Sequence, residues 1–234
     1  MTAGIPNSLL AALPRKSYLR LLPGLAAVDL VFGDVLYEAG APIRDVYFPG
    51  RSLVSLLTVV EGHLALEVGL VGREGMVGFP LALGVGVSPV RALVQGAGPA
   101  LKMSAPRFSA ELRRNPPLQA ELQRYVHAMM AQISQTAACN RFHLVAARLA
   151  RWLLMTRDRM RSAEFRMTHE FLSHMLGVRR VGVTEAASAL QRRKLIEYRR
   201  GNIKILDDRG LEAASCSCYK VVRNMHDGKP GLAR

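Results

Sequence analysis

Cysteine is rare in this sequence, which has only Cys139, Cys216 and Cys218 among its 234 residues. These three cysteines lack the paired spacing of a disulfide framework, which excludes the class of small secreted domains held together by disulfides. The cysteine content is consistent with a protein of a reducing compartment. No apolar run is long enough to cross a bilayer, and the N-terminus lacks the charged, apolar and small-residue segments of a secretory signal. We therefore expect a cytoplasmic protein that does not associate with a membrane.

Enzyme motifs are missing as well: the sequence has no P-loop, no G-x-S-x-G nucleophile elbow and no zinc-ligand spacing. His169 and His174 lie five residues apart on one predicted helix and do not share a face. Cys216-x-Cys218 has no companion His/Cys pair, so we expect a buried structural role for these two cysteines. The sequence therefore predicts no catalytic residues, no metal site and no resident cofactor. An enzyme that acts on nucleic acid or nucleotide is a competing function class.

Acidic residues are the minority among the charged ones, with 18 Asp and Glu against 32 Lys and Arg and a formal net charge of +14. The excess is uneven, because residues 1–138 carry a net charge of +3 and residues 139–234 one of +11. A strongly basic half suits a surface that displaces counterions from nucleic-acid phosphates. A basic helix on a membrane surface is the weaker alternative, since these charges are spread over a stretch patterned like a globular domain.

The basic half contains two short helical patterns separated by Gly177. Apolar residues recur at three- and four-residue spacing over 171–176 and again over 183–190. Glycine can take the positive φ that ends one helix and lets the next begin at a steep angle, and Thr168 can cap the first helix through its hydroxyl. The pattern predicts a helix-turn-helix, whose second helix enters a DNA major groove. An ordinary helical hairpin with a solvated charged face is the alternative.

The second helix, from about Arg179 to Gln191, has an apolar side and a polar side. Val183, Ala186 and Leu190 form the side expected to be buried. On the other side, arginine suits guanine, glutamate accepts a hydrogen bond from cytosine, and valine can touch a thymine methyl. The candidate base contacts are Arg180, Val181, Thr184, Glu185 and Ser188.

A basic hairpin is predicted directly after this helix, where IEYRR and IKILD indicate two strands around a tight turn at Gly201-Asn202. Such a hairpin beside a recognition helix is a wing that can hold phosphates. The candidate phosphate contacts are Thr168, Arg179, Arg199, Arg200 and Lys204, and His169 is a further candidate DNA contact.

Residues 168–195 followed by this wing resemble the DNA-binding domain of the Crp/Fnr family of bacterial transcription regulators. The segment GVRRVGVTEAASALQRRKLI is similar to a branch of that family not closely related to the cyclic-AMP receptor. Val181 and Glu185 stand where the receptor pattern has glutamate and arginine, so the operator sequence does not carry over. The resemblance implies a homodimeric regulator with double-stranded DNA and RNA polymerase as partners.

The N-terminal half shows short apolar runs that end at glycine or proline, among them Val31–Tyr37 and Asp45–Pro49. Many short strands of this kind indicate a β-barrel or jelly roll. The segment FGDVLYEAGAPIRDVYFPGRSLVSL resembles the opening strands of the cyclic-nucleotide-binding fold that forms the sensor half of the family. The expected fold class is α+β, with this sensor domain, a long dimerisation helix and a C-terminal winged helix-turn-helix.

The resemblance also implies an effector pocket, in which a glycine-led loop, an arginine and a glutamate hold a cyclic nucleotide. Here Met76 stands in the glutamate place and Val87 in the arginine place, so we expect a remodelled or vestigial pocket that does not bind cyclic AMP in the usual way. A remodelled pocket that still responds to a cyclic nucleotide is the alternative, as is a nucleotide-binding module whose basic half docks an acidic partner. Iron–sulfur sensing is not expected, because no cysteine precedes Cys139. The candidate pocket residues are Gly75, Met76, Val77, Gly78, Ser88 and Arg91.

A helix start is predicted at Asn115-Pro116-Pro117, and an apolar stripe follows it at four- and three-residue steps. The stripe could belong to a plain core helix, whereas the family resemblance implies a helix that packs against its copy in a homodimer. Two recognition helices about one helical turn apart would then bind a two-fold symmetric operator. The candidate dimer contacts are Leu118, Leu122, Val126, Met129 and Ile133.

The predicted domain limits follow from these patterns. Residues 1–110 are expected to form the sensor domain, residues 111–139 the dimerisation helix and hinge, and residues 140–234 the DNA-binding domain. The segment from Cys139 to His143 interrupts the apolar stripe and is predicted to be the hinge between the sensor and DNA-binding domains, and Trp152 is predicted to anchor the core of the last domain.

Overall fold

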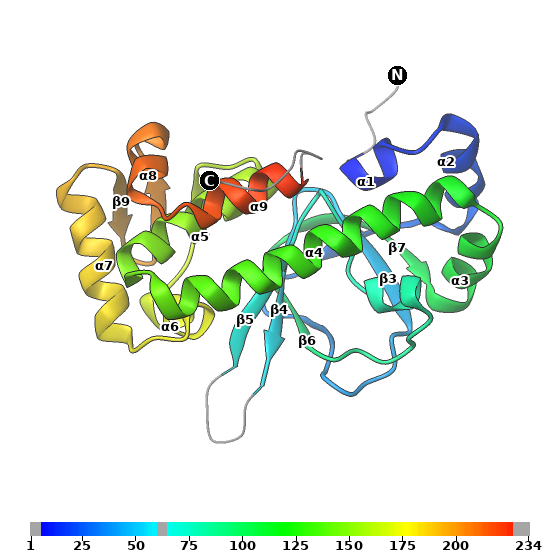
Figure 1. Cartoon of the computed structure of the whole chain (residues 1–234), viewed down its shortest axis with the longest axis horizontal. Helices are drawn as coiled ribbons and strands as arrows, with labels where there is room; N and C mark the ends of the chain where they lie inside the picture. The colour runs from blue at the N-terminus through cyan, green and yellow to red at the C-terminus, as the bar shows by residue number, and fades with distance from the viewer. Residues whose placement is uncertain (1–5, 60–64, 227–234) are drawn as a thin grey trace. The chain divides into compact units, whose positions relative to one another are not determined.

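The computed structural model describes residues 6–59 and 65–226, which fall into two compact units. Unit 1 comprises Met1–Thr58 and Gly69–Met130, and unit 2 comprises Val59–Val68 and Ala131–Arg234. The division falls inside the long helix α4 (Pro116–Phe142), at a different place from the limits at 110 and 139 that the sequence patterns suggested. Figure 1 labels most of the helices and strands of both units.

Unit 1 is built around two antiparallel sheets in the described part of the chain. One has the strand order β1-β7-β3 and the other β2-β6-β4-β5, so the non-sequential neighbours are typical of a jelly roll and no closed barrel forms. The strands are β1 (Ala26–Leu30), β2 (Val35–Tyr37), β3 (Asp45–Pro49), β4 (Leu53–Thr58), β5 (Leu66–Val71), β6 (Arg91–Gly96) and β7 (Gly98–Ser104).

Helices cover the ends of these sheets. They are α1 (Ser8–Ala11), α2 (Arg15–Leu21), the 3-10 helices η1 (Leu22–Gly24) and η2 (Phe79–Leu83), and α3 (Ala105–Arg113). The Asn7 side chain is fully buried, donates to the carbonyls of Pro49 and Gly75, and caps α1 by accepting from the Leu10 amide. This one amide therefore joins the N-terminal helix to the sheets.

The predicted strand over Val31–Tyr37 is wrong in its limits. β1 ends at Leu30 and β2 starts at Val35, because Gly33 adopts a φ of 91° and turns the chain between them. The predicted strand at Asp45–Pro49 is confirmed as β3.

Helix α4 buries its apolar stripe inside its own chain, so the prediction that this stripe forms the dimer contact is wrong. Leu118 and Met129 are fully buried, Leu122 and Val126 are nearly so, and Ile133 is half-buried. The stripe therefore belongs to a core helix, which was the alternative prediction from the sequence. A different face of α4 is exposed, and its residues follow each other at steps of four and three: Gln123, His127, Met130, Ser134, Ala137 and Arg141.

Unit 2 consists of helices packed around α5 (Val145–Met160), together with the three-stranded antiparallel sheet β8-β10-β9 (Figure 1). Helix α5 contacts α6, α7, α8 and α9, and Trp152 and Leu153 are buried at its centre, as predicted for Trp152. The other elements are β8 (Glu164–Arg166), α6 (His169–Leu176), α7 (Arg180–Arg192), β9 (Ile196–Arg199), β10 (Asn202–Ile205), α8 (Asp208–Ala214) and α9 (Cys218–His226).

The long helix ends inside the segment predicted as the hinge, since Cys139 to Phe142 are still helical. Helix α4 continues through Phe142, and only His143 and Leu144 separate it from α5. Among the described helices, none combines the length and the apolar character needed to cross a membrane.

Candidate nucleic-acid interface

Helix α7 presents one polar face to solvent because its other face is buried in the core of unit 2. Val183, Ala186, Ala187 and Leu190 are all buried, and α7 contacts α5 and α6 through them. The five predicted base contacts are all exposed, with Val181 as much as 65% exposed. The structure therefore gathers Arg180, Val181, Thr184, Glu185 and Ser188 on one accessible side of the helix.

The turn between α6 and α7 forms as its sequence predicts. The Thr168 hydroxyl accepts a hydrogen bond from the Phe171 amide at 3.1 Å, which caps the first turn of α6. Gly177 ends α6 with a φ of 60°, in the left-handed region that favours glycine. Together they set the point where α6 starts and the angle at which α7 leaves it.

His169 has a role that the sequence did not indicate. Its Nδ1 lies 3.0 Å from the Thr184 hydroxyl, and its ring stacks on Tyr198 with 4.2 Å between centroids, while Nε2 is buried. Burial, and then the charge of Arg180, lowers the pKa of His169 below its ordinary 6.5. The half-buried ring thus joins α6, α7 and β9, and the assignment of His169 as a DNA contact stays a prediction.

The predicted wing is present, with its turn one residue earlier than expected. β9 and β10 pair antiparallel with Arg199 opposite Asn202, so the two turn residues are Arg200 and Gly201, with φ of 50° and 80°. Two positive φ values in sequence are typical of a type I′ hairpin turn. Strand β8, which the sequence patterns missed because it is only three residues long, pairs with β10 and broadens the wing into a sheet.

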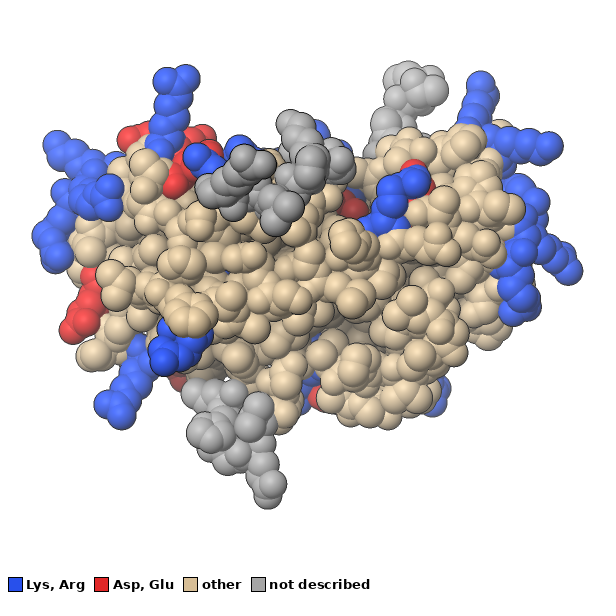
Figure 2. Space-filling view, viewed as in Figure 1, with Lys and Arg blue, Asp and Glu red and all other residues tan. Residues whose placement is uncertain are grey.

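The basic side chains of α7 and the wing are free to meet an anion. On the face that Figure 2 shows, Lys and Arg side chains project around the end of unit 2 that carries α7 and β9. In the described part of the chain, the predicted phosphate contacts Arg179, Arg199, Arg200 and Lys204 are exposed and form no ion pair. Exposed residues that the sequence reasoning did not select extend this surface: Arg166, Arg192, Arg193 and Lys194.

The predicted effector residues are buried or paired within the protein. Met76 and Val77 are fully buried, and the Tyr125 ring packs against Gly75 while its hydroxyl donates to the Met76 carbonyl at 3.1 Å. Ser88 is buried and bonded to the Val90 carbonyl, and Arg91 pairs with Glu38 at 2.6 Å. The glycine-led loop is thus filled by the protein's own aromatic side chain.

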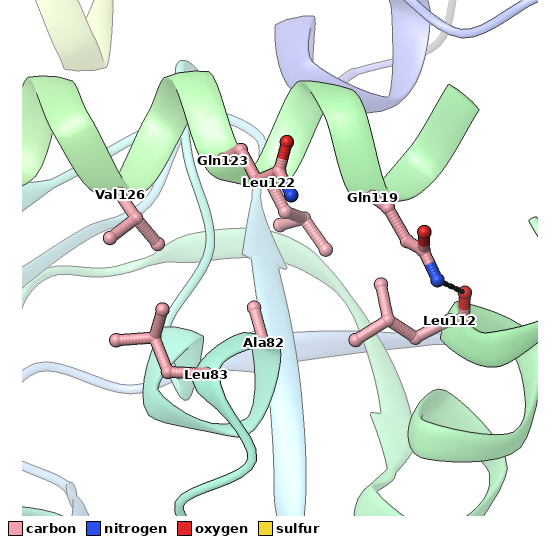
Figure 3. A pocket seen from close by; sticks show the side chains of 7 residues that line it. All are labelled: Ala82, Leu83, Leu112, Gln119, Leu122, Gln123 and Val126. Carbon is pink, nitrogen blue, oxygen red and sulfur yellow. Dashed lines mark hydrogen bonds between the residues drawn. The ribbon is translucent and has the colours of Figure 1, made fainter. Parts of the chain in front are cut away.

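Two pockets in the described part of unit 1 are lined by residues other than the predicted effector residues. Figure 3 shows one of about 130 Å³ between α4, η2 and α3, where Gln119 donates to the Leu112 carbonyl. This volume is well below the roughly 300–1,000 Å³ typical of small-molecule sites. Another, of about 310 Å³, is open and lies beside β2 and β3, and none of the predicted effector residues lines either one. The residues that line the smaller pocket are Ala82, Leu83, Leu112, Gln119, Leu122, Gln123 and Val126. The residues that line the larger pocket are Leu36, Tyr37, Ala41, Pro42, Arg44, Asp45 and Tyr47.

Unit 2 also brings together four side chains that can ligate a metal. The donor atoms of Cys139, His143, Cys216 and Cys218 all lie within 4.8 Å of one another. A hydrogen bond from Cys216, aided by the charge of Arg151 and opposed by burial, lowers the pKa of Cys139 to about 5. The sequence reasoning missed this group because it placed Cys139 and His143 in a hinge. The premise that the C-terminal cysteines have no companion pair is wrong.

Comparison with known proteins agrees with the geometry of unit 2. Residues 147–214 match the family model of the Crp-like helix-turn-helix domain, which includes α6, α7 and the wing. No curated protein matches the sequence.

Solved structures with the same fold cover most of the chain. FixK2 from Bradyrhizobium japonicum has a TM-score of 0.69 at 11% identity and covers 82% of this chain and 98% of its own. The c-di-GMP-responsive global regulator CLP from Xanthomonas campestris has a TM-score of 0.67 at 14% identity, with coverages of 83% and 100%. A CRP-family transcriptional regulator from Thermus thermophilus has a TM-score of 0.61 at 17% identity, with coverages of 88% and 100%. CLP is a global regulator and the Thermus protein is a transcriptional regulator, so the matches with a stated role are regulators rather than enzymes.

The contact between Gly75 and Tyr125 predicts the effect of a small substitution. A Cβ at Gly75 would lie 2.1 Å from Cε2 of Tyr125, so Gly75→Ala should displace the ring and reduce the free energy of unfolding by about 1–3 kcal/mol. Urea denaturation measures this change. Gly86→Ala is the control, because a Cβ there meets no atom within 4 Å, and equal stability of the two variants would contradict the packing.

The lowered pKa of His169 predicts a pH dependence of stability. The unfolded chain binds the proton more tightly than the folded one, so the folded state loses stability as pH falls below the ordinary value of 6.5 and keeps it above. His169→Gln should reduce the difference between the free energies of unfolding at about pH 7.5 and about pH 5.5. Substitution of the exposed His127 should leave that difference as in the parent, and an unchanged difference in His169→Gln would contradict the assignment.

Proposed function

We infer that this chain, a DNA-binding transcription regulator with a Crp-like helix-turn-helix domain, acts as a homodimer on a two-fold symmetric operator. The observation that carries the proposal is the exposed polar face of α7 next to unpaired basic residues of the wing. A helix of this kind lies in the major groove, and the wing lies along the adjacent backbone. RNA polymerase is the expected further partner at the promoter.

The side chains of this surface divide into two kinds of contact. Arg180 and Glu185 are exposed on α7, where a guanidinium can bind guanine and a carboxylate can accept from cytosine. The Thr184 hydroxyl donates to the Arg180 carbonyl and is bonded to His169, which leaves its methyl group for an apolar base contact. Thr168, Arg179, Arg199, Arg200 and Lys204 would hold phosphates, which position the protein without reading the sequence.

The exposed face of α4 supports the homodimer. Gln123, His127, Met130, Ser134, Ala137 and Arg141 repeat at alternating steps of four and three, which is the spacing of a coiled-coil seam. Met130 is 63% exposed in the single chain, and the small side chains of Ser134 and Ala137 allow two helices to approach closely. This seam replaces the buried stripe as the proposed contact between copies.

The packed loop around Gly75 supports a regulator that needs no cyclic nucleotide. A ribose and phosphate would have to displace the Tyr125 ring and break its hydrogen bond to the Met76 carbonyl. We therefore propose that the protein binds its operator with cyclic AMP absent.

Selection of genomic fragments by the purified protein, with and without cyclic AMP, should recover a two-fold symmetric motif in both conditions.

On that operator, Arg180→Ala should reduce discrimination against random DNA by about 1–3 kcal/mol, because it removes a base contact. Lys204→Ala should weaken binding to all DNA alike and flatten the salt dependence by a slope of about 1. Arg113→Ala, an exposed arginine of unit 1, is the control. Equal losses on specific and random DNA in both variants would contradict this division.

A charge in the seam of α4 should separate the two copies. Met130→Glu should convert a dimer into a monomer in light scattering and weaken operator binding by about 10²–10⁴-fold, because the two half-sites are no longer bound together. Arg124→Glu makes a charge change on the same helix outside the seam and should remain dimeric. A parent protein that is monomeric, or a Met130→Glu variant that stays dimeric, would rule out this interface.

A further inference from the structure

The cysteines of unit 2 meet at the junction of two helices that lie far apart in the sequence. Cys139 is in the last turn of α4 and His143 follows one turn later, where its amide donates to the Cys139 carbonyl at 3.1 Å. Cys218 is the first residue of α9, and Cys216 lies just before it in the chain. The three cysteines are buried and His143 is partly buried.

The distances between the donor atoms fit a single ion. Cys139 Sγ lies 3.5 Å from Cys216 Sγ, and Cys218 Sγ lies 3.5 Å from His143 Nδ1. Around tetrahedral zinc, with Zn–S bonds of about 2.3 Å, neighbouring sulfurs lie about 3.8 Å apart. A cluster with several iron atoms would need its ligands spread around more than one metal.

The surroundings suit a bound cation with several thiolates. Gln135 Nε2 donates to Cys218 Sγ at 3.1 Å, which orients that sulfur. Arg148 and Arg151 are buried, and their charges act on Cys139 and Cys216. Zinc with three thiolates carries a net charge of −1, which these buried guanidinium groups can offset.

We propose that Cys139, His143, Cys216 and Cys218 bind one zinc ion that fastens the start of α9 to the end of α4. All four ligands come from the protein, which is the arrangement of a structural zinc site rather than a catalytic one. The nine-residue α9 is too short to be stable alone, so the ion supplies folding free energy at the C-terminal end of unit 2. A Cys139–Cys216 disulfide would not explain why Cys218 and His143 lie beside these two cysteines.

The metal content of the full-length protein tests this proposal. Protein purified under reducing conditions without chelator should contain one zinc ion per chain, and zinc removal should lower its melting temperature. Cobalt exchanged for zinc should give the visible absorption of a tetrahedral site and the near-ultraviolet band of sulfur-to-cobalt charge transfer.

Variants separate specific binding from adventitious zinc. His143→Ala and Cys218→Ser should lose zinc to a competing chelator under conditions in which the parent and His174→Ala, a change at a histidine of α6, retain it. Gln135→Ala should lower the zinc affinity by about 10–100-fold, because it removes a hydrogen bond to a ligand.

The following results would overturn the proposal: a parent protein that takes up neither zinc nor cobalt, equal zinc retention in His143→Ala and Cys218→Ser, or a Cys139–Cys216 disulfide found by mass spectrometry in reduced preparations. If a variant fails to fold, the cobalt spectrum of the parent decides, since an octahedral spectrum or none is incompatible with this ligand set.

Discussion

The burial of α7 against α5 is the contact on which the interface depends. Once Val183, Ala186 and Leu190 are in the core, α7 cannot rotate about its axis without exposing them and burying charged residues such as Arg180. Each large apolar side chain removed from water contributes about 1.5–3 kcal/mol, and an unpaired buried charge costs more. The core of unit 2 therefore fixes which side chains can meet a DNA base.

The other contacts of unit 2 refine this arrangement. The Thr168 cap and the left-handed Gly177 set the ends of α6, and the neutral His169 ring connects α6 to Thr184 of α7 and to Tyr198 of β9. Burial of that ring, and then the nearby charge of Arg180, lowers the pKa of His169, so these contacts favour its neutral form. The recognition surface is thus positioned by groups that need not touch DNA.

Helix α4 shows the limit of sequence patterns. Its apolar stripe was correctly recognised as helical, yet its partner was wrong, because periodicity shows that a face is buried and does not show against what. The missed group of metal-ligating side chains and the missed strand β8 have related causes: Cys139 and His143 meet Cys216 and Cys218 from the far end of the chain, and β8 forms because β10 supplies its hydrogen bonds. Neither partner is a local neighbour in the chain.

The sequence alone determined the helix-turn-helix, its cap, its glycine turn and the exposed polar face of its second helix, because these depend on residues within a few positions of one another. The excess positive charge of residues 139–234 and the short strands of the N-terminal half could also be predicted from the sequence, because neither depends on contacts between distant residues. Only the tertiary structure decided that Tyr125 fills the loop at Gly75, that the exposed face of α4 runs through Met130, and that Cys139 and His143 meet Cys216 and Cys218. Those contacts join residues that are distant in sequence, and their geometry is set by the packing of whole helices and sheets.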